Sequence, residues 1–215
     1  MKGVFDLILS FLGLIVLSPV FLILGFLIKI HDKGPVSFRQ FRVGRSGRLF
    51  RIWKFRTMIP NAGAVGGAIT VGQDSRITPL GHNLRRFKLD EFPQLINVLL
   101  GEMSLVGPRP EVEKYVKLYS PEQKRVLELK PGITDPASFA FYDESSLLAK
   151  VADADRFYQE KLMPEKIRIN LDYAAKAGLF SDFILIVATL AHAVGIKINI
   201  FRWLNIRAPE LSFEK

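Results

Sequence analysis

The densest group of potentially reactive side chains lies between residues 85 and 94, where three cations precede the adjacent carboxylates Asp90 and Glu91. An ionised carboxylate can attack phosphorus and form an acyl phosphate, and a second carboxylate beside it can bind a metal or move a proton. Nearby arginines, Arg85 first among them, would keep Asp90 ionised and attract a diphosphate. Acidic residues are also common in the first turn of a helix, simply as partners of its dipole. The pair alone leaves both interpretations open.

A turn further along the chain could present a phosphate-binding group. Arg109 lies between Pro108 and Pro110, which restrict the backbone on both sides. A guanidinium held in this way suits bidentate phosphate binding, although an ordinary turn with a surface arginine remains the alternative. Residues 131–134 form another turn, which adds the hydroxyl of Thr134.

Basic residues recur throughout residues 36–58, which read as two strands around the turn 44–47. A solvated basic surface near anionic lipid explains most of them. It explains Lys54 and Arg56 less well, because they lie among Trp53, Phe55 and Met58. These two cations are therefore further candidates for phosphate binding.

These candidate residues follow an N-terminal apolar segment that could enter a membrane. Residues 7–28 contain no charged residue, and a helix of that length reaches about 30 Å, enough to cross a bilayer core. A cleavable signal peptide would have a shorter apolar region and would end in small residues. The basic residues that follow place the next domain on the cytoplasmic side.

Ser18 and Pro19 interrupt this apolar segment. Pro19 removes one helical hydrogen bond and disfavours helical geometry at Ser18. Two readings remain open from the residues alone: a kinked spanning helix, or a helix–break–helix that enters and leaves by the same face.

The remaining sequence predicts an α+β fold: a small, mostly helical catalytic domain with a short β-hairpin. We expect a membrane anchor over 1–32 and a catalytic domain over 33–215. Residues 61–72 read as a Gly/Ala-rich loop. The interrupted apolar pattern of residues 180–206 favours C-terminal amphipathic helices that lie at the membrane interface, or dock on the core, and do not span the membrane. Further helices are expected over 80–89, 93–100, 122–129 and 152–175.

Composition is consistent with this division. The chain has 215 residues, 49% hydrophobic and 24% charged, with a formal net charge of +9. A basic excess fits nucleic acid, anionic lipid or phosphorylated substrates. Cysteine is absent, which excludes a disulfide framework and thiol chemistry.

Four motifs in order give the chain a specific resemblance. Residues 53–58 (WKFRTM), 89–95 (LDEFPQL), 103–110 (MSLVGPRP) and 130–134 (KPGIT) resemble the signature strings of the bacterial sugar transferases. These enzymes are the monotopic polyprenyl-phosphate phosphoglycosyl transferases. The resemblance runs from the N-terminal segment to about Thr134.

The resemblance implies a function. The family transfers a sugar-1-phosphate from a UDP-sugar to polyprenyl (undecaprenyl) phosphate, releasing UMP, as the first membrane step in building a capsule, O-antigen, exopolysaccharide or glycoprotein glycan. Asp90 takes the place of the nucleophile, and Glu91 would deprotonate the acceptor or organise Mg²⁺ together with Asp90. Arg85 and Arg109, and with them Lys54, Arg56 and Thr134, would bind substrate phosphate.

The resemblance also implies a location. It makes residues 18–19 the break of a re-entrant helix and places the catalytic domain on the cytoplasmic face of the bacterial inner membrane. The expected partners are the two substrates and the phospholipid membrane, with no nucleic acid; a homodimer is left open. The segment 135–141 departs from the Gly-Leu-Ala-Gln that many members carry, so the sugar cannot be inferred from a relative.

Two rival readings remain. Asp153 and Asp155 match the Asp-x-Asp metal motif of glycosyl transferases that release UDP, but no nucleotide-binding βαβ pattern precedes them. A membrane-anchored basic adaptor for anionic lipid or nucleic acid would fit the charge, yet such a protein gains nothing from adjacent carboxylates.

Overall fold

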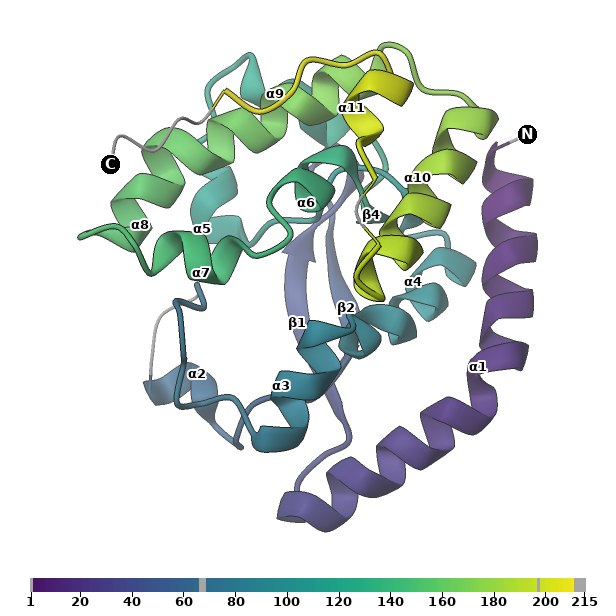
Figure 1. Cartoon of the computed structure of the whole chain (residues 1–215), viewed down its shortest axis with the longest axis vertical. Helices are drawn as coiled ribbons and strands as arrows, with labels where there is room; N and C mark the ends of the chain where they lie inside the picture. The colour runs from purple at the N-terminus through teal and green to yellow at the C-terminus, as the bar shows by residue number, and fades with distance from the viewer. Residues whose placement is uncertain (1, 66–68, 197, 211–215) are drawn as a thin grey trace.

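The computed structural model describes residues 2–65, 69–196 and 198–210, so part of the loop expected over 61–72 lies outside the described residues. The fold is α+β and mostly helical, as predicted, with two small sheets (Figure 1). The helices are α1 (Lys2–Asp32), α2 (Ala62–Val65), α3 (Pro79–Arg86), α4 (Leu95–Leu99), α5 (Glu113–Val116), α6 (Pro136–Ala140), α7 (Glu144–Leu148), α8 (Ala154–Phe157), α9 (Met163–Ala174), α10 (Leu179–Ala193) and α11 (Ile200–Trp203). The strands are β1 (Ser37–Val43), β2 (Leu49–Phe55), β3 (Ser104–Val106) and β4 (Gly132–Thr134), and the short 3-10 or π segments are η1 (Arg45–Gly47), η2 (Leu89–Gln94), η3 (Gln123–Glu128) and η4 (Tyr158–Leu162).

The predicted hairpin is confirmed. Strands β1 and β2 pair antiparallel, and positive φ angles at Ser46 and Gly47 allow the chain to reverse between them. Because side chains alternate along a strand, Phe50 and Ile52 enter the core from one face, and Lys54 lies on that same face.

A second sheet was not predicted. Strands β3 and β4 pair in parallel, with Ser104 opposite Gly132 and Val106 opposite Thr134. Each strand is only three residues long. Both strands contact α10, and β3 leads into the Pro-Arg-Pro turn.

The helical predictions are confirmed in outline and wrong in detail. Pro93 belongs to η2, and α4 begins only at Leu95. The segment 122–129 is a 3-10 helix, and 152–175 divides into α8, η4 and α9. Residues 180–206 divide into α10 and the short α11.

Helix α1 is one continuous helix that bends, instead of two helices separated by a break. Figure 1 shows the change of direction about midway along α1. Pro19 lies inside the helix, and the hydroxyl of Ser18 donates to the carbonyl oxygen of Ile15 at 2.8 Å. That hydrogen bond replaces the one that Pro19 cannot donate, which is how the helix tolerates the proline.

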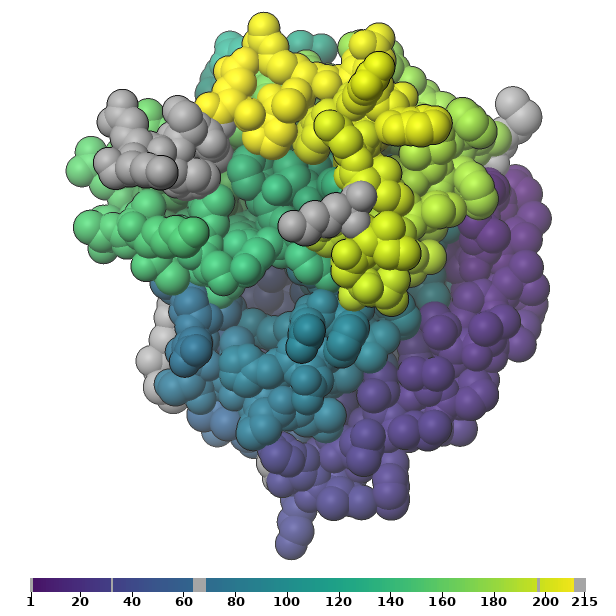
Figure 2. Space-filling model, viewed as in Figure 1, coloured from purple at the N-terminus to yellow at the C-terminus, as the bar shows by residue number. Residues whose placement is uncertain are grey.

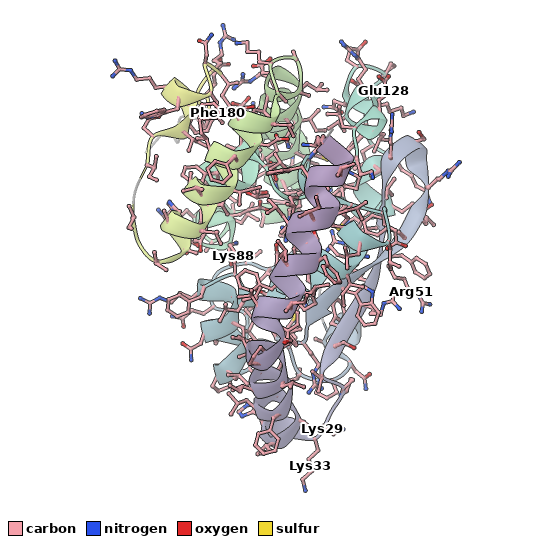
Figure 3. All side chains as sticks on the ribbon, turned by 90° about the vertical axis from the view of Figure 1, so that its right-hand side faces the viewer. Lys29, Lys33, Arg51, Lys88, Glu128 and Phe180 are labelled. Atoms are coloured by element: carbon pink, nitrogen blue, oxygen red, sulfur yellow. The ribbon has the colours of Figure 1, made fainter. Side chains whose placement is uncertain are left out.

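One side of α1 packs on the rest of the molecule along both halves. Near the N-terminus, Gly13 lets α1 approach Leu95 of α4, and beyond the bend the ring of Phe21 meets that of Phe55 edge-on at 5.4 Å. Leu24 and Ile28 are buried there. Figure 3 faces α1 and shows Lys29 and Lys33 at one end of it, with Phe180 of α10 near the other end.

The opposite side of α1 is apolar and uncovered. In Figure 2 the helix forms one edge of the molecule, with nothing over its outer side. Among the described residues, α1 is the one helix long and apolar enough to cross a membrane. Its exposed side chains include Val4, Leu7, Ile8, Phe11, Ile15, Val16, Leu22, Ile23, Phe26 and Ile30.

Candidate active site

The carboxylate pair lies on η2, between α3 and α4. Lys88 has a left-handed backbone conformation (φ 55°) that ends α3 and redirects the chain. Asp90 and Glu91 follow at once, and both are buried, with 6% and 7% of their surface exposed. Buried carboxylates are rare unless they are paired or functional, so their partners decide what this site can do.

Glu91 binds two cations that come from distant parts of the chain. The Nζ of Lys54, on β2, lies 2.8 Å from its Oε1. The guanidinium of Arg109 donates to both carboxylate oxygens, with Nη1 2.9 Å from Oε2 and Nη2 bonded to Oε1. The fork of an arginine matches the planar carboxylate, which makes this a bidentate pair.

These contacts shift three pKa values. Burial alone would raise the pKa of Glu91, but Arg109 and Lys54 hold it well below its usual range. Glu91 in turn raises the pKa of Arg109. Burial lowers the pKa of Lys54 to about 8, although Glu91 opposes the shift. Glu91 and Arg109 are therefore charged at neutral pH, and Lys54 is the group nearest to losing its proton.

Asp90 has a different environment from Glu91. Its pKa is raised, first by burial and then by the negative charge of Glu91, while Lys54 and Arg85 oppose that shift. Its Oδ1 is buried and has no hydrogen-bond partner among the described residues. Adjacent carboxylates whose pKa values move in opposite directions are suited to different roles. Both carboxylate oxygens of Glu91 bind cations, whereas Oδ1 of Asp90 is not engaged by any described residue.

Arg85 lies close enough to this carboxylate pair to interact with its charge. Its Nε donates to Thr57 at 2.8 Å and its Nη1 to Thr70 at 3.2 Å, which fix the side chain on α3. Burial lowers the pKa of Arg85, and the charges of Asp90 and Glu91 oppose that shift. Arg85 thus contributes positive charge close to Asp90.

The strand pair β3–β4 holds Arg109 in place. The amide of Gly107 donates to Thr134 at 3.0 Å, and that of Gly132 donates to Pro108 at 3.0 Å. Neither glycine has room for a Cβ, because a Cβ at Gly132 would meet the backbone of Gly107 and one at Gly107 would meet the carbonyl of Lys130. The turn is therefore anchored immediately before Arg109, which supports the rigid presentation that the flanking prolines predict.

Comparison with known proteins decides the family. A family model described as bacterial sugar transferase matches residues 1–195. The chain belongs to this family.

Three curated relatives agree with that assignment. The exopolysaccharide production protein ExoY of Sinorhizobium fredii (strain NBRC 101917 / NGR234) is 35% identical over 173 residues, 74% of this chain and 76% of the relative. The UDP-glucose:undecaprenyl-phosphate glucose-1-phosphate transferase of Escherichia coli (strain K12) is 34% identical over 88% of this chain. The UDP-N-acetylgalactosamine-undecaprenyl-phosphate N-acetylgalactosaminephosphotransferase of Aeromonas hydrophila is 40% identical over 86% of this chain. Of the latter two relatives the match covers only 39% and 41%, less than half of their length.

The structure of this sugar transferase joins Lys54, Glu91 and Arg109 by direct contacts, with Asp90 next to Glu91 and the charge of Arg85 close to both carboxylates. Their roles in the reaction stay predictions. Arg56 and Thr134 also have contacts with other parts of the molecule. The guanidinium of Arg56 lies against Gly34, where it leaves no room for a Cβ, at the junction of α1 and β1. The hydroxyl of Thr134 shares a 2.7 Å hydrogen bond with Thr189 of α10.

Sequence reasoning missed a set of residues behind Arg109. Arg42 lies 3.4 Å from Glu111, and the hydroxyl of Tyr158 donates to the same carboxylate. Burial lowers the pKa of Arg42 and Glu111 opposes the shift. Alternation along the hairpin could have revealed Arg42, because it lies on the same strand face as Lys54.

Tyr142 is another residue whose role was not assigned from sequence. Its hydroxyl donates to the carbonyl of Arg86 at 3.0 Å, and the Nζ of Lys88 lies 4.6 Å from its ring centre. Burial first, then the charges of Asp90 and Glu91, raise its pKa, which places its hydroxyl within reach of their field. Tyr142 follows the divergent segment 135–141, which therefore ends beside the site.

The Asp-x-Asp triplet has structural partners. Asp153 caps α8 by accepting from the amide of Arg156 at 3.0 Å. Asp155 accepts from Tyr115 at 2.6 Å and pairs with Lys114 at 3.0 Å. Both members of the triplet therefore have structural roles in the described part of the chain.

Proposed function

We propose that this sugar transferase moves a sugar-1-phosphate from a UDP-sugar to polyprenyl phosphate and releases UMP, through a covalent intermediate on Asp90. The names of the relatives support the class of donor and acceptor. The observation that carries the mechanism is the contrast between Glu91, bound by Lys54 and Arg109, and Asp90, whose buried Oδ1 has no hydrogen-bond partner in the described part of the chain.

The first step is an exchange at phosphorus. A carboxylate oxygen of Asp90 forms a bond to the phosphorus that bears the sugar, and the bond from that phosphorus to the bridging oxygen breaks. UMP leaves with the electron pair, and Asp90 holds an acyl phosphate ester of the sugar. Arg85, Lys54 and Arg109 supply positive charge where the equatorial oxygens gain negative charge.

The second step regenerates the carboxylate. A phosphate oxygen of the polyprenyl phosphate attacks the same phosphorus, the bond to Asp90 breaks, and polyprenyl-diphospho-sugar leaves. A carboxylate whose pKa is held far below its usual range is a weak base. We therefore assign Glu91 the role of holding Arg109 and Lys54 in position, with the dianionic form of the acceptor as the attacking species.

Mg²⁺ is part of this proposal, and Asp90 is the one carboxylate of the pair that is not already engaged by cations in the described residues. No group of three or more His, Asp or Glu side chains in the described ranges could hold a metal, and both oxygens of Glu91 are engaged. Mg²⁺ is often held by one or two carboxylates plus substrate phosphates, so Asp90 would hold it together with the donor. When bound, it neutralises diphosphate charge and stabilises the leaving phosphate.

We propose further that α1 is re-entrant and that the catalytic domain lies at the cytoplasmic face. Both ends of α1 pack on the same domain: Asp6 accepts from Ser104 at 2.7 Å, and beyond the bend Phe21 meets Phe55. A straight spanning helix would carry one of these ends about 30 Å away, to the other side of the bilayer core. The uncovered outer side of α1 is the part that would meet lipid.

Helix α10 would continue this membrane surface. Its exposed apolar side chains recur every three or four residues, which is the spacing of one helix face. An apolar face of this kind on a basic protein fits the lipid interface, where the polyprenyl chain of the acceptor is confined. The residues are Phe180, Phe183, Val187, Leu190 and Val194.

The test is to identify the nucleotide product and the covalent adduct. Full-length protein in nanodiscs would receive undecaprenyl phosphate, Mg²⁺ and a panel of UDP-sugars. We expect UMP as product and, when the acceptor is omitted, a mass increase of one sugar-phosphate on the peptide that contains Asp90. Asp90→Asn should abolish both signals.

Asp153→Asn is the matched control, because it changes an exposed carboxylate of α8 and leaves the site intact. It should keep the activity of the natural protein. Release of UDP, or UMP release that survives in Asp90→Asn, would refute the proposed mechanism. Release of neither nucleotide from any donor would favour the adaptor reading.

A further inference from the structure

The N-terminal turns of α1 carry a carboxylate that membrane insertion alone does not explain. Asp6 is only 5% exposed, although apart from Lys2 and Ser10 the rest of the first half of α1 is apolar. Burying a carboxylate is costly unless it is well hydrogen-bonded. Both oxygens of Asp6 point to the same strand: Ser104 donates its hydroxyl to Oδ2 at 2.7 Å, and the amide of Leu105 approaches Oδ1 at 3.4 Å.

Lys2 joins α1 to Val106, the next residue along β3. Its Nζ donates to the carbonyl oxygen of Val106 at 3.0 Å and forms an ion pair with Asp182 of α10. Asp182, only 2% exposed, also accepts from the hydroxyl of Tyr173 at 2.6 Å. Every residue of β3 is thus hydrogen-bonded to the first two turns of α1.

Strand β3 leads directly into the turn that carries Arg109. Only Gly107 and Pro108 separate Val106 from Arg109, and Gly107 is fixed by its contact with Gly132. A shift of β3 would therefore be passed on to the guanidinium with little opportunity for relaxation. The bidentate contact between Arg109 and Glu91 depends on that placement.

We infer that Asp6 is a positioning residue, through which the N-terminal end of the membrane helix sets the place of Arg109 in the donor site. Lys2 assists it. This inference rests on the proposed function, in which Arg109 supplies positive charge to the reacting phosphate of the donor. It gives α1 a role in donor binding that is separate from anchoring the protein in the bilayer.

The experiment compares three variants of this connection in nanodiscs. Asp6→Leu removes both acceptors, Asp6→Asn keeps one, and Ser104→Ala removes a single donor. We expect Asp6→Leu to raise the donor KM about tenfold, as one charge-assisted hydrogen bond would. Asp6→Asn and Ser104→Ala should lie between it and the natural protein, and the acceptor KM should stay unchanged.

Ile169→Ala is the control for a loss of stability alone, because it removes fully buried packing from α9, outside both α1 and β3. Its Tm should fall without a change in donor KM. Hydrogen exchange of residues 104–111 gives a readout that needs no activity. It should increase in Asp6→Leu and Ser104→Ala and stay unchanged in Ile169→Ala.

Unchanged exchange over 104–111 in the Asp6 and Ser104 variants would overturn the inference, whatever the activity. The inference would also be overturned if the donor KM rose in step with the loss of Tm in these variants and in Ile169→Ala alike. If the natural protein released no UMP while the exchange pattern changed as expected, the proposed function would fail and the connection from α1 to the Arg109 turn would stand.

Discussion

The ammonium group of Lys54 lies 2.8 Å from Glu91, yet burial still lowers the pKa of Lys54 to about 8. The loss of hydration on burial outweighs the attraction of the carboxylate, and Arg109, beside the lysine, lowers the pKa further. The site therefore contains one cation, Lys54, whose charge depends on pH close to neutrality, and one, Arg109, whose charge does not.

This difference predicts the pH profile. If cationic Lys54 stabilises the donor phosphates, kcat/KM for the UDP-sugar should fall as the pH rises through about 8. On the acid side, activity should appear only above the ordinary pKa of an aspartate, because the pKa of Asp90 is raised. Initial rates of UMP release across pH, at low donor concentration, would measure both limits.

Lys54→Arg tests the assignment, because arginine keeps its proton throughout this range. The alkaline limit should move upward or disappear in the variant, even if the maximal rate is lower. An alkaline limit that stays near its original pH would assign it to another group.

Neutralising Asp90 and neutralising Glu91 should have different effects on formation of the covalent adduct. Asp90→Asn removes the nucleophile and should give no covalent adduct. Glu91→Gln keeps the nucleophile but releases Arg109 and Lys54 from their shared partner. We expect the adduct to form about 10²- to 10³-fold more slowly, as when one preorganised electrostatic contact is lost. Rapid-quench mass spectrometry without acceptor would measure the rate of adduct formation in each variant. Equal loss of the adduct in Asp90→Asn and Glu91→Gln would contradict the different roles assigned to the two carboxylates.

Sequence established part of this site and missed the rest for identifiable reasons. The hairpin was predictable because strand alternation and glycines mark it, and Asp90, Glu91 and Arg109 were identifiable from their motifs. The parallel pair β3–β4 was not, since three-residue strands carry no periodicity and their pairing depends on tertiary contact. It was also unpredictable that Arg109 would pair with Glu91. That pairing depends on the distance between segments far apart in the chain.

Arg56 illustrates the same limit. It is two residues from Lys54 in an apparently equivalent setting, but β2 ends at Phe55. The backbone amide of Arg56 then bonds to Val36 at 2.9 Å, and its side chain packs on Gly34. A motif gives the order of its residues along the chain, but not which of them face the site.

The close contact between Gly107 and Gly132 predicts a loss of both stability and activity. A Cβ in Gly132→Ala would meet the backbone of Gly107, so β3 and β4 must separate. Forcing one methyl group into a tight contact costs about 1–3 kcal/mol, and Arg109 would move with β3. Thermal unfolding and UMP release would both fall. Gly63→Ala, where the added methyl meets no atom within 4 Å, is the control and should change neither. Equal behaviour of the two variants would contradict the packing argument.

The contacts at both ends of α1 predict the side of the membrane on which the N-terminus lies. Because Lys2 and Asp6 are bonded to β3 and α10, the first turn of α1 should be on the same side as the catalytic domain. The chain contains no cysteine, so single cysteines can be labelled without a background signal. Gly3→Cys has no neighbour within 4 Å to obstruct it, and Arg48→Cys, exposed at the tip of the hairpin, marks the domain. In sealed inverted vesicles, a membrane-impermeant maleimide should label both variants, and in right-side-out cells it should label neither. Labelling of Gly3→Cys from the outside, with Arg48→Cys protected, would instead require a spanning helix and the loss of the contacts that join α1 to β3.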